Sequence, residues 1–393
     1  MTAGAAPLTL QPPPTSPAPE RDRAQRRLRP RSFSLDDALV LGAAMLSSFS
    51  LVWVVYAMLL PLSGIPGFVV CWYFTFLAMY WAAVLLLRGR LPARDALMGA
   101  LVTTGAAAVV IPLGLVIGFV IYKGVALISP HFFVATTQFC GELSAASCGG
   151  VGHAIVGTLE QVGIAVLFAV PLAILCAVFL SEIGGPLRRP VFLFVDAMSG
   201  VPSIVAGLFI YAVWVIGLNR GFNGLGASLA LAILMLPTVT RTSFEVLRLV
   251  PSGLREGALA LGASEWRTTV SVVLPTARSG LITAVVLGIA RAVGETAPLL
   301  FTAFGASVMN ANPLNGPQEA LPAFVYEYIR FNPGTGPYQR AWSAALTLTF
   351  LVLLLFTSAR VIGSLMSVEH RQRRAVRRER RAVARAAAQA GAT

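Results

Sequence analysis

Residues 250–275 read VPSGLREGALALGASEWRTTVSVVLP, and they separate two long apolar stretches of the chain. Pro251 and Ser252 are typical of the start of a helix, and Gly262 is typical of its end. An apolar face at helical spacing is formed by Leu254, Ala258 and Leu261. The segment therefore predicts a short amphipathic helix, which either lies on a membrane surface or docks a soluble partner protein.

The composition around this segment excludes most soluble proteins. Hydrophobic residues make up 56% of the 393 residues and charged residues only 12%, with a mean hydropathy of +0.76, whereas soluble domains carry roughly 25% charged residues. The net charge is nevertheless +13. A nucleic-acid-binding protein would explain the basic charge but not the hydropathy, so we expect a membrane protein with no nucleic-acid partner.

Eight apolar stretches are long enough to cross about 30 Å of hydrocarbon as helices, and none alternates like a barrel strand. The expected fold is an all-α integral membrane protein with about eight transmembrane helices. Pro202 and Pro237 lie inside the fifth and sixth stretches, and such prolines mark kinks or breaks. The stretches are Leu39–Leu60, Gly67–Leu87, Met98–Tyr122, Ile155–Leu180, Val191–Gly217, Leu225–Phe244, Leu281–Phe304 and Ala341–Met366.

The distribution of basic residues predicts the orientation. With the N-terminus in the cytoplasm, the tails and cytoplasmic connections hold 23 basic residues and the outer connections hold four. Basic residues concentrate on the cytoplasmic side of membrane proteins, so both termini are expected there. Residues 1–37, rich in Pro and Arg, are expected to be a disordered tail, and residues 367–393 a second basic tail.

The residues that commonly build enzyme sites do not form a recognisable constellation. The only lysine, Lys123, is followed by Gly124 rather than Ser or Thr, so the chain has no Walker A nucleotide loop. The histidines lack metal-ligand spacing, and no metal or cofactor is expected. Cys140 and Cys148 flank a short polar segment on the expected outer side, where a disulfide and two free thiols are both compatible with the sequence. The chain is therefore not expected to be an enzyme.

The 250–275 segment resembles the EAA signature of ABC-importer permease subunits, which runs Glu-Ala-Ala, then Gly, then Ile-x-Leu-Pro. Gly257 stands for the middle Ala and Val272 for the Ile. The resemblance implies a coupling helix that docks a separate ATP-binding subunit. The matching coupling residues are Glu256, Gly257, Ala258, Gly262, Leu274 and Pro275.

Three further strings resemble the PstA family, the permease subunits of the high-affinity phosphate importer, and the first two together make the resemblance specific. They are LPTVTRT at 236–242, ARAVGETAPLL at 290–300 and SGVPSIVAGLF at 199–209. The match covers about residues 98–366, which implies a type I ABC-importer permease core with its coupling loop at about 247–278. Residues 38–97 would then form two extra N-terminal transmembrane helices.

This resemblance implies a multi-pass protein of the bacterial inner membrane, surrounded by lipid, that moves inorganic phosphate into the cytoplasm. The implied partners are a PstC-like second permease, a PstB-like ATP-binding subunit and a PstS-like phosphate-binding protein. A permease for another oxyanion, such as sulfate, molybdate or phosphonate, remains an alternative. A secondary anion transporter or channel is a second alternative.

Charged residues inside the apolar stretches mark the expected substrate path. Arg291 and Glu295 lie one helical turn apart, as do Arg241 and Glu245, so each pair can partly neutralise itself. An arginine that is not saturated by its partner offers a fork of donors to phosphate oxygens. The same pairs are also compatible with a purely structural role between helices.

Two hydroxyl residues complete the expected path. Thr296 follows Glu295 in the same string, and Ser203 follows Pro202. The Ser203 hydroxyl either hydrogen-bonds a passing anion or satisfies backbone carbonyls freed by the proline.

Overall fold

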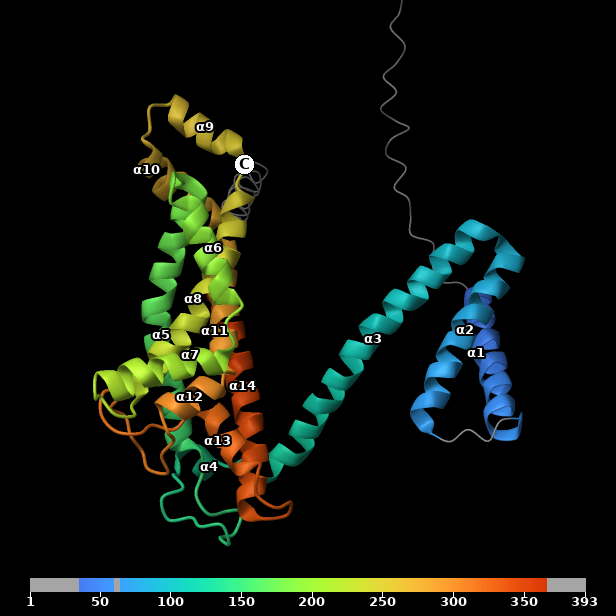
Figure 1. The fold of residues 1–393 in the computed structure, drawn as a ribbon, viewed down its shortest axis with the longest axis horizontal. Helices are drawn as coiled ribbons and strands as arrows, with labels where there is room; N and C mark the ends of the chain where they lie inside the picture. The colour runs from blue at the N-terminus through green and yellow to red at the C-terminus, as the bar shows by residue number, and fades with distance from the viewer. Residues whose placement is uncertain (1–34, 60–63, 366–393) are drawn as a thin grey trace, which may run out of the picture. The chain divides into compact units, whose positions relative to one another are not determined.

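The computed structural model describes residues 35–59 and 64–365, and within these ranges the regular structure is helical apart from one isolated bridge between Phe304 and Gln318 (Figure 1). The expected tails therefore lie almost wholly outside the described residues. The α-helices are α1 Leu35–Trp53, α2 Ile65–Arg88, α3 Arg90–Gly124, α4 Pro130–Val134, α5 Gly152–Val178, α6 Arg188–Ser199, α7 Ser203–Ile210, α8 Gly224–Arg248, α9 Ser252–Ala260, α10 Glu265–Thr268, α11 Leu274–Val293, α12 Ala297–Thr302, α13 Leu321–Tyr328 and α14 Gly336–Leu365.

Short stretches of other helical geometry continue several of these helices. They are the π-helical turns η2 Val54–Leu59, η4 Phe179–Ile183, η5 Tyr211–Gly217 and η6 Thr269–Val273, and the 3₁₀ turn η3 Val125–Leu127.

The chain divides into two compact units, the first ending at Leu113 and the second beginning at Gly114. In the first unit, α1 and α2 pack against each other, and the indole Nε1 of Trp72 donates to Ser48 Oγ at 3.2 Å. An ion pair between Arg88 and Asp37 joins the end of α2 to the start of α1. A small apolar core of Ala44, Phe76 and Leu77 lies between them.

The second unit is built around α5 and α8, which pack closely along their lengths. Small residues allow this approach, since fully buried alanines recur every fourth position on α5. These alanines are Ala165, Ala169, Ala173 and Ala177. Of the most apolar 18 residues of α8, 67% are buried, against 33% in α5 and 17% in α14. Helix α8 is therefore the central helix of the unit.

Seven helices in the described residues are long and apolar enough to cross a membrane, and the bent pair α6–α7 raises the number to eight. The predicted all-α membrane fold with about eight spans is confirmed. The predicted fifth stretch is broken: α6 and α7–η5 meet at 102° around Pro202. Helix α8, in contrast, runs without interruption through Pro237.

The predicted seventh span, Leu281–Phe304, is wrong in its boundaries. The spanning helix runs Glu265–Val293, and α12 is a separate short helix beyond a break at residues 294–296. Gly294 caps the first helix, and Pro298 lies in the first turn of the second. The residues on both sides of this break are apolar, so the hydropathy pattern did not reveal the break.

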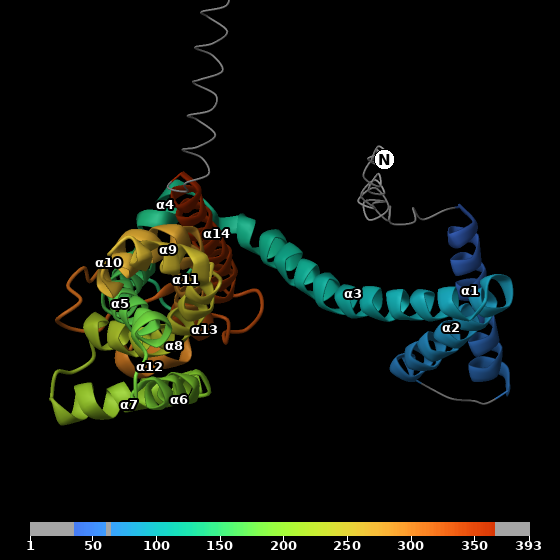
Figure 2. The same cartoon turned by 90° about the horizontal axis from the view of Figure 1, so that it is seen from above.

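The two ends of the second unit carry different features. Helices α9 and α10 lie at one end, whereas α4 and the loop that follows it lie at the other (Figure 1). Viewed along the unit, α6 and α7 lie along one side and α14 lies on the opposite side (Figure 2). The broken helices therefore line one lateral face of this unit.

Candidate functional site: a coupling helix and a charged membrane face

Helix α9 forms as its sequence predicts and stands clear of the unit's core. It begins after Pro251, and Gly262 just beyond its end has φ +84°, a conformation that favours glycine. Glu256 is exposed, and the side chains of Leu261 and Trp266 are 91% and 64% exposed. Such an exposed apolar and acidic surface is suited to a partner protein.

Arg255, the residue before Glu256, anchors α9 to the unit. Its Nε and Nη2 donate to the two carboxylate oxygens of Glu182 at 3.0 and 2.9 Å. Its Nη1 and Nη2 also donate to the carbonyl oxygens of Val250 and Leu247, at 2.7 and 2.9 Å, at the C-terminal end of α8. One guanidinium thereby connects the extension of α5, the end of α8 and the coupling helix.

Arg291 lies near the end of α11 with two partners. Its Nε donates to Glu295 Oε1 at 3.5 Å, and its Nη1 donates to Thr238 Oγ1 on α8 at 3.2 Å. The side chain remains 46% exposed. The guanidinium is therefore positioned by its neighbours without being enclosed by them.

Arg241 pairs differently from the expectation. Its Nη1 lies 2.7 Å from Asp196 Oδ1 on α6, and among the ion pairs of the described residues none joins it to Glu245. Glu245 is exposed on α8. The expected Arg241–Glu245 pair was wrong because α6 brings a carboxylate from a distant part of the sequence to the same guanidinium.

The two arginines share one face of the unit. Thr238 and Arg241 are three residues apart on α8, which places them on the same side about one turn apart, and Thr238 is bonded to Arg291. Isolated charges in hydrocarbon cost about 2.5–3.5 kcal/mol each on insertion scales. This exposed charged face therefore requires a water-filled path or a protein partner rather than lipid.

Helix breaks flank this face. Ser203 begins α7 directly after the Pro202 break, and Thr296 precedes α12 after the Gly294 break. The two short helices pack tightly, since a Cβ atom on Gly207 would lie 2.6 Å from Pro298 Cα. Irregular backbone at membrane depth is typical of helices that line a substrate path.

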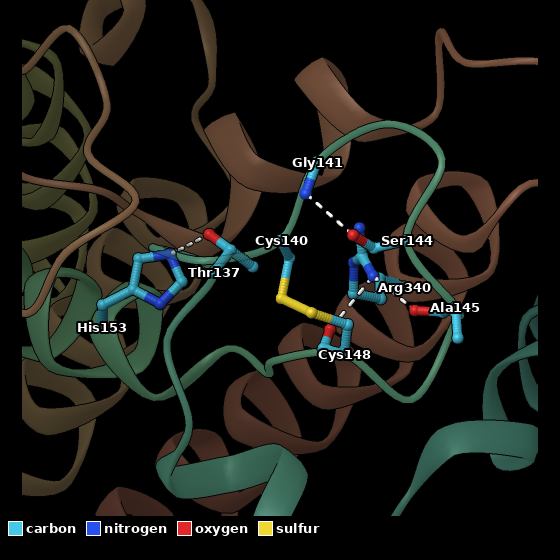
Figure 3. Close-up of a disulfide and its surroundings, with 8 residues drawn as sticks. All are labelled: Thr137, Cys140, Gly141, Ser144, Ala145, Cys148, His153 and Arg340. Atoms are coloured by element: carbon cyan, nitrogen blue, oxygen red, sulfur yellow. Dashed lines mark hydrogen bonds between the residues drawn. A yellow bond between two sulfur atoms is a disulfide. The ribbon is translucent and has the colours of Figure 1, made fainter.

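At the opposite end, Cys140 and Cys148 form a disulfide that closes the loop between α4 and α5 (Figure 3). The buried guanidinium of Arg340 lies against this loop, where its Nη1 donates to the carbonyl oxygens of Ala145 and Cys148 at 3.1 and 3.0 Å. The loop and the start of α14 are thereby joined.

The same end contains two neighbouring carboxyl groups that the sequence pattern did not single out. A Cβ atom on Gly305 would lie 3.0 Å from Glu319 Oε2 and 3.3 Å from Glu327 Oε1. Burial, with the nearby Glu327 carboxylate, raises the pKa of Glu319 to about 8. Burial also raises the pKa of Glu327. Within the described residues, no cluster of His, Cys, Asp and Glu is arranged to hold a metal ion.

Comparison with known proteins identifies the family. Residues 169–367 match the family described as the inner membrane component of binding-protein-dependent transport systems. The chain is also 41% identical over 228 residues to the phosphate transport system permease protein PstA 1 of Mycobacterium tuberculosis, covering 58% of this chain and 75% of that protein. The chain belongs to the PstA family.

Other matches are more distant in sequence. The PstA protein of Pasteurella multocida is 37% identical over 243 residues, which cover 61% of this chain and 84% of that one. A solved structure of the methionine ABC transporter MetNI in an inward-facing conformation aligns with a TM-score of 0.43 and 21% identity, covering 55% of this chain and 94% of that one.

PstA-family membership fixes the general role of the chain. It is a transport permease of the ABC-importer type rather than an enzyme, and it is a multi-pass inner membrane protein. Binding-protein-dependent transport implies an ATPase and a substrate-binding protein as partners.

Sequence reasoning did not predict the contacts of three participants in this arrangement: Asp196, Thr238 and Glu182. Asp196 and Glu182 reach their arginines from distant parts of the sequence, so no spacing rule connects them. Thr238 lies inside the family string at 236–242, and its position three residues before Arg241 was the one signal available.

Proposed function

We propose that this chain is the transmembrane permease subunit of an ATP-binding cassette importer that moves inorganic phosphate into the cytoplasm. The observation that carries the proposal is the exposed membrane face on which Arg291 and Arg241 each have a carboxylate partner and free donor capacity. A separate ATPase supplies the energy and docks on the Glu256–Gly262 segment.

The chemistry of phosphate suits this face. Phosphate carries between one and two negative charges at neutral pH, and a path for it requires fixed cations. A guanidinium offers five donors in a planar fork that matches phosphate oxygens. We expect each arginine to release its carboxylate partner while it contacts phosphate and to re-form the ion pair as phosphate leaves, so that the guanidinium always has an anionic partner. Glu245, Thr296 and Ser203 remain candidate residues of the same path.

Motion of the ATPase reaches the membrane through α9. Because Arg255 bonds Glu182 and the carbonyls that end α8, displacement of α9 pulls on α5 and α8 together. This rigid connection fits domain-scale switching between outward-open and inward-open states.

The finer assignments are also part of this proposal. The partners are a PstC-like permease, a PstB-like ATPase and a PstS-like phosphate-binding protein, and both termini lie in the cytoplasm. The permease core corresponds to residues 98–366, and the two helices within 38–97 are peripheral additions.

Co-purification tests the docking assignment. Glu256→Arg places a cation where the ATPase is expected to meet a carboxylate, so the ATP-binding subunit is expected to be lost from the purified complex. Glu142→Arg, an exposed change at the other end of the unit, is the matched control and is expected to keep it. Retention of the ATPase by both variants contradicts the docking assignment, as does phosphate uptake without any ATPase.

A further inference from the structure

A pocket of about 390 Å³ lies where α6 begins and α8 ends. This is the end of the unit that carries α9 (Figure 1). Three of its lining residues are arginines and two are phenylalanines. The lining residues are Gly185, Arg188, Arg189, Phe192, Phe244 and Arg248.

The pocket is cationic and contains no carboxylate among its lining residues. Ion pairs neutralise other arginines, such as Arg241 with Asp196 and Arg255 with Glu182. Within the described residues, Arg188, Arg189 and Arg248 have no such partner. The guanidinium of Arg248 lies 5.6 Å from the centre of the Phe244 ring, a contact that leaves its charge unneutralised. The three charges are therefore available to an anion.

Aromatic side chains form the wall of the pocket behind these charges. Phe192 and Phe244 meet edge to face with their ring centres 5.8 Å apart, and Phe244 continues into a buried cluster that includes Leu247 and Val250. Cations beside an apolar wall match a ligand that carries a phosphate group, either on apolar chains or as the free ion.

The pocket lies at the edge of the membrane-spanning segments. Arg248 is the last residue of the span Gly224–Arg248, and Arg188 is the first residue of the bent pair. In the proposed orientation this edge is the inner leaflet, where anionic lipid headgroups attract basic residues.

We infer that this pocket binds a phosphate group, carried by an anionic phospholipid headgroup or present as free cytoplasmic phosphate. The pocket lies next to the anchor of the coupling helix, since its residues Gly185 and Arg248 are close in sequence to Glu182 and Leu247. Both Glu182 and the Leu247 carbonyl accept hydrogen bonds from Arg255. A phosphate group bound here holds α6 and α8 together beside the anchor of the coupling helix.

The test for a lipid source uses the full chain in its complex, in nanodiscs of phosphatidylglycerol or phosphatidylcholine, with bound lipid measured by native mass spectrometry. Arg189→Gln with Arg248→Gln is the pocket variant. Arg90→Gln with Arg94→Gln removes the same charge from exposed positions on α3 and is the control. We expect the pocket variant alone to bind phosphatidylglycerol about tenfold or more weakly, with phosphatidylcholine unaffected.

The test for free phosphate uses lipid-stripped complex and labelled inorganic phosphate. If phosphate binding persists in Arg291→Ala but is lost in the pocket variant, the bound phosphate lies in this pocket and not in the transport path. This outcome does not depend on whether the proposed transport role is correct. Equal binding of both phosphatidylglycerol and phosphate by the pocket variant and the control variant overturns the inference.

Discussion

Arg291 is held by two partners on different elements, the Glu295 carboxylate beyond the end of its own helix and the Thr238 hydroxyl on α8. Arg291→Ala removes the donors without disturbing a buried core, since the side chain is 46% exposed. A hydrogen bond to a charged group contributes about 1.5–3 kcal/mol, so we expect phosphate uptake to fall about tenfold to a hundredfold while the complex still assembles.

Uptake by reconstituted complex, with subunit stoichiometry measured on the same sample, checks this expectation. Arg360 is exposed on α14. The Arg360→Ala variant also loses one arginine, and the complex that contains it should transport phosphate normally. If Arg291→Ala instead dissociates the complex, the ion pair has the structural role of joining helices.

Glu319 predicts a pH dependence at the other end of the unit. Its pKa is raised from 4.5 to about 8 by burial and by Glu327, so the folded chain holds a proton that the unfolded chain releases between these values. Folding stability should therefore fall as pH rises from 4.5 to about 8 and then level off. Hydrogen exchange across residues 303–321 at several pH values measures this. Glu319→Gln should reduce the slope to the contribution of Glu327, whose pKa is also raised by burial. Glu142→Gln, an exposed control, should keep the full slope; equal slopes in the two variants would falsify the assignment.

At the scale of single elements, α9 offers a matched pair of glycines. A Cβ atom added at Gly257 would have open space around it, whereas Gly262 has the positive φ of +84°. Gly257→Ala removes the conformational freedom of glycine inside a helix and should stabilise α9 by about 0.5–1 kcal/mol. Gly262→Ala forces alanine into a left-handed conformation and should destabilise the turn by about 1–2 kcal/mol.

Hydrogen exchange of the α9 amides measures both changes in one experiment. Transport should persist in Gly257→Ala, because that change restores the Glu-Ala-Ala string. An equal effect of the two substitutions would contradict the assigned turn at Gly262.

Breaking the Arg255–Glu182 ion pair is expected to uncouple phosphate transport from ATP hydrolysis rather than to abolish ATP hydrolysis. Glu182 is 8% and Arg255 25% exposed, so removing one partner of this partly buried pair leaves polar groups unsatisfied at a cost of about 1–3 kcal/mol. Glu182→Gln should therefore loosen α9 from α5 while leaving the outer surface of α9 unchanged. We expect the ATPase to bind and hydrolyse ATP, with fewer phosphates transported per ATP.

The measurement is the ratio of phosphate uptake to ATP hydrolysis in proteoliposomes. Asp95→Asn, an exposed carboxylate on α3, is the control and should keep the ratio of the unchanged chain. An unchanged ratio in Glu182→Gln would show that α9 transmits its motion by another contact.

Local sequence patterns predicted α9 well because its start, its apolar face and its terminal glycine all act within a few residues. The break after Val293 was not predictable from hydropathy, since α12 is as apolar as a continuing helix. The partner of Arg241 was not predictable either, because Asp196 reaches it only once α6 has packed beside α8.

At the scale of the whole molecule, the basic residues behind the net charge of +13 occupy two kinds of position. Most basic residues lie in the tails and in the connections between the apolar stretches. Arg241 and Arg291 are different, because each lies within a span and is exposed beside a carboxylate.

The central claim is that this permease moves phosphate, and competition uptake by the reconstituted complex tests it most directly. Labelled phosphate uptake should require ATP and be inhibited by arsenate, which has the same charge and shape, and it should resist excess sulfate and molybdate. The account would be contradicted if sulfate or molybdate suppressed uptake as strongly as unlabelled phosphate does. Uptake without ATP would also contradict it.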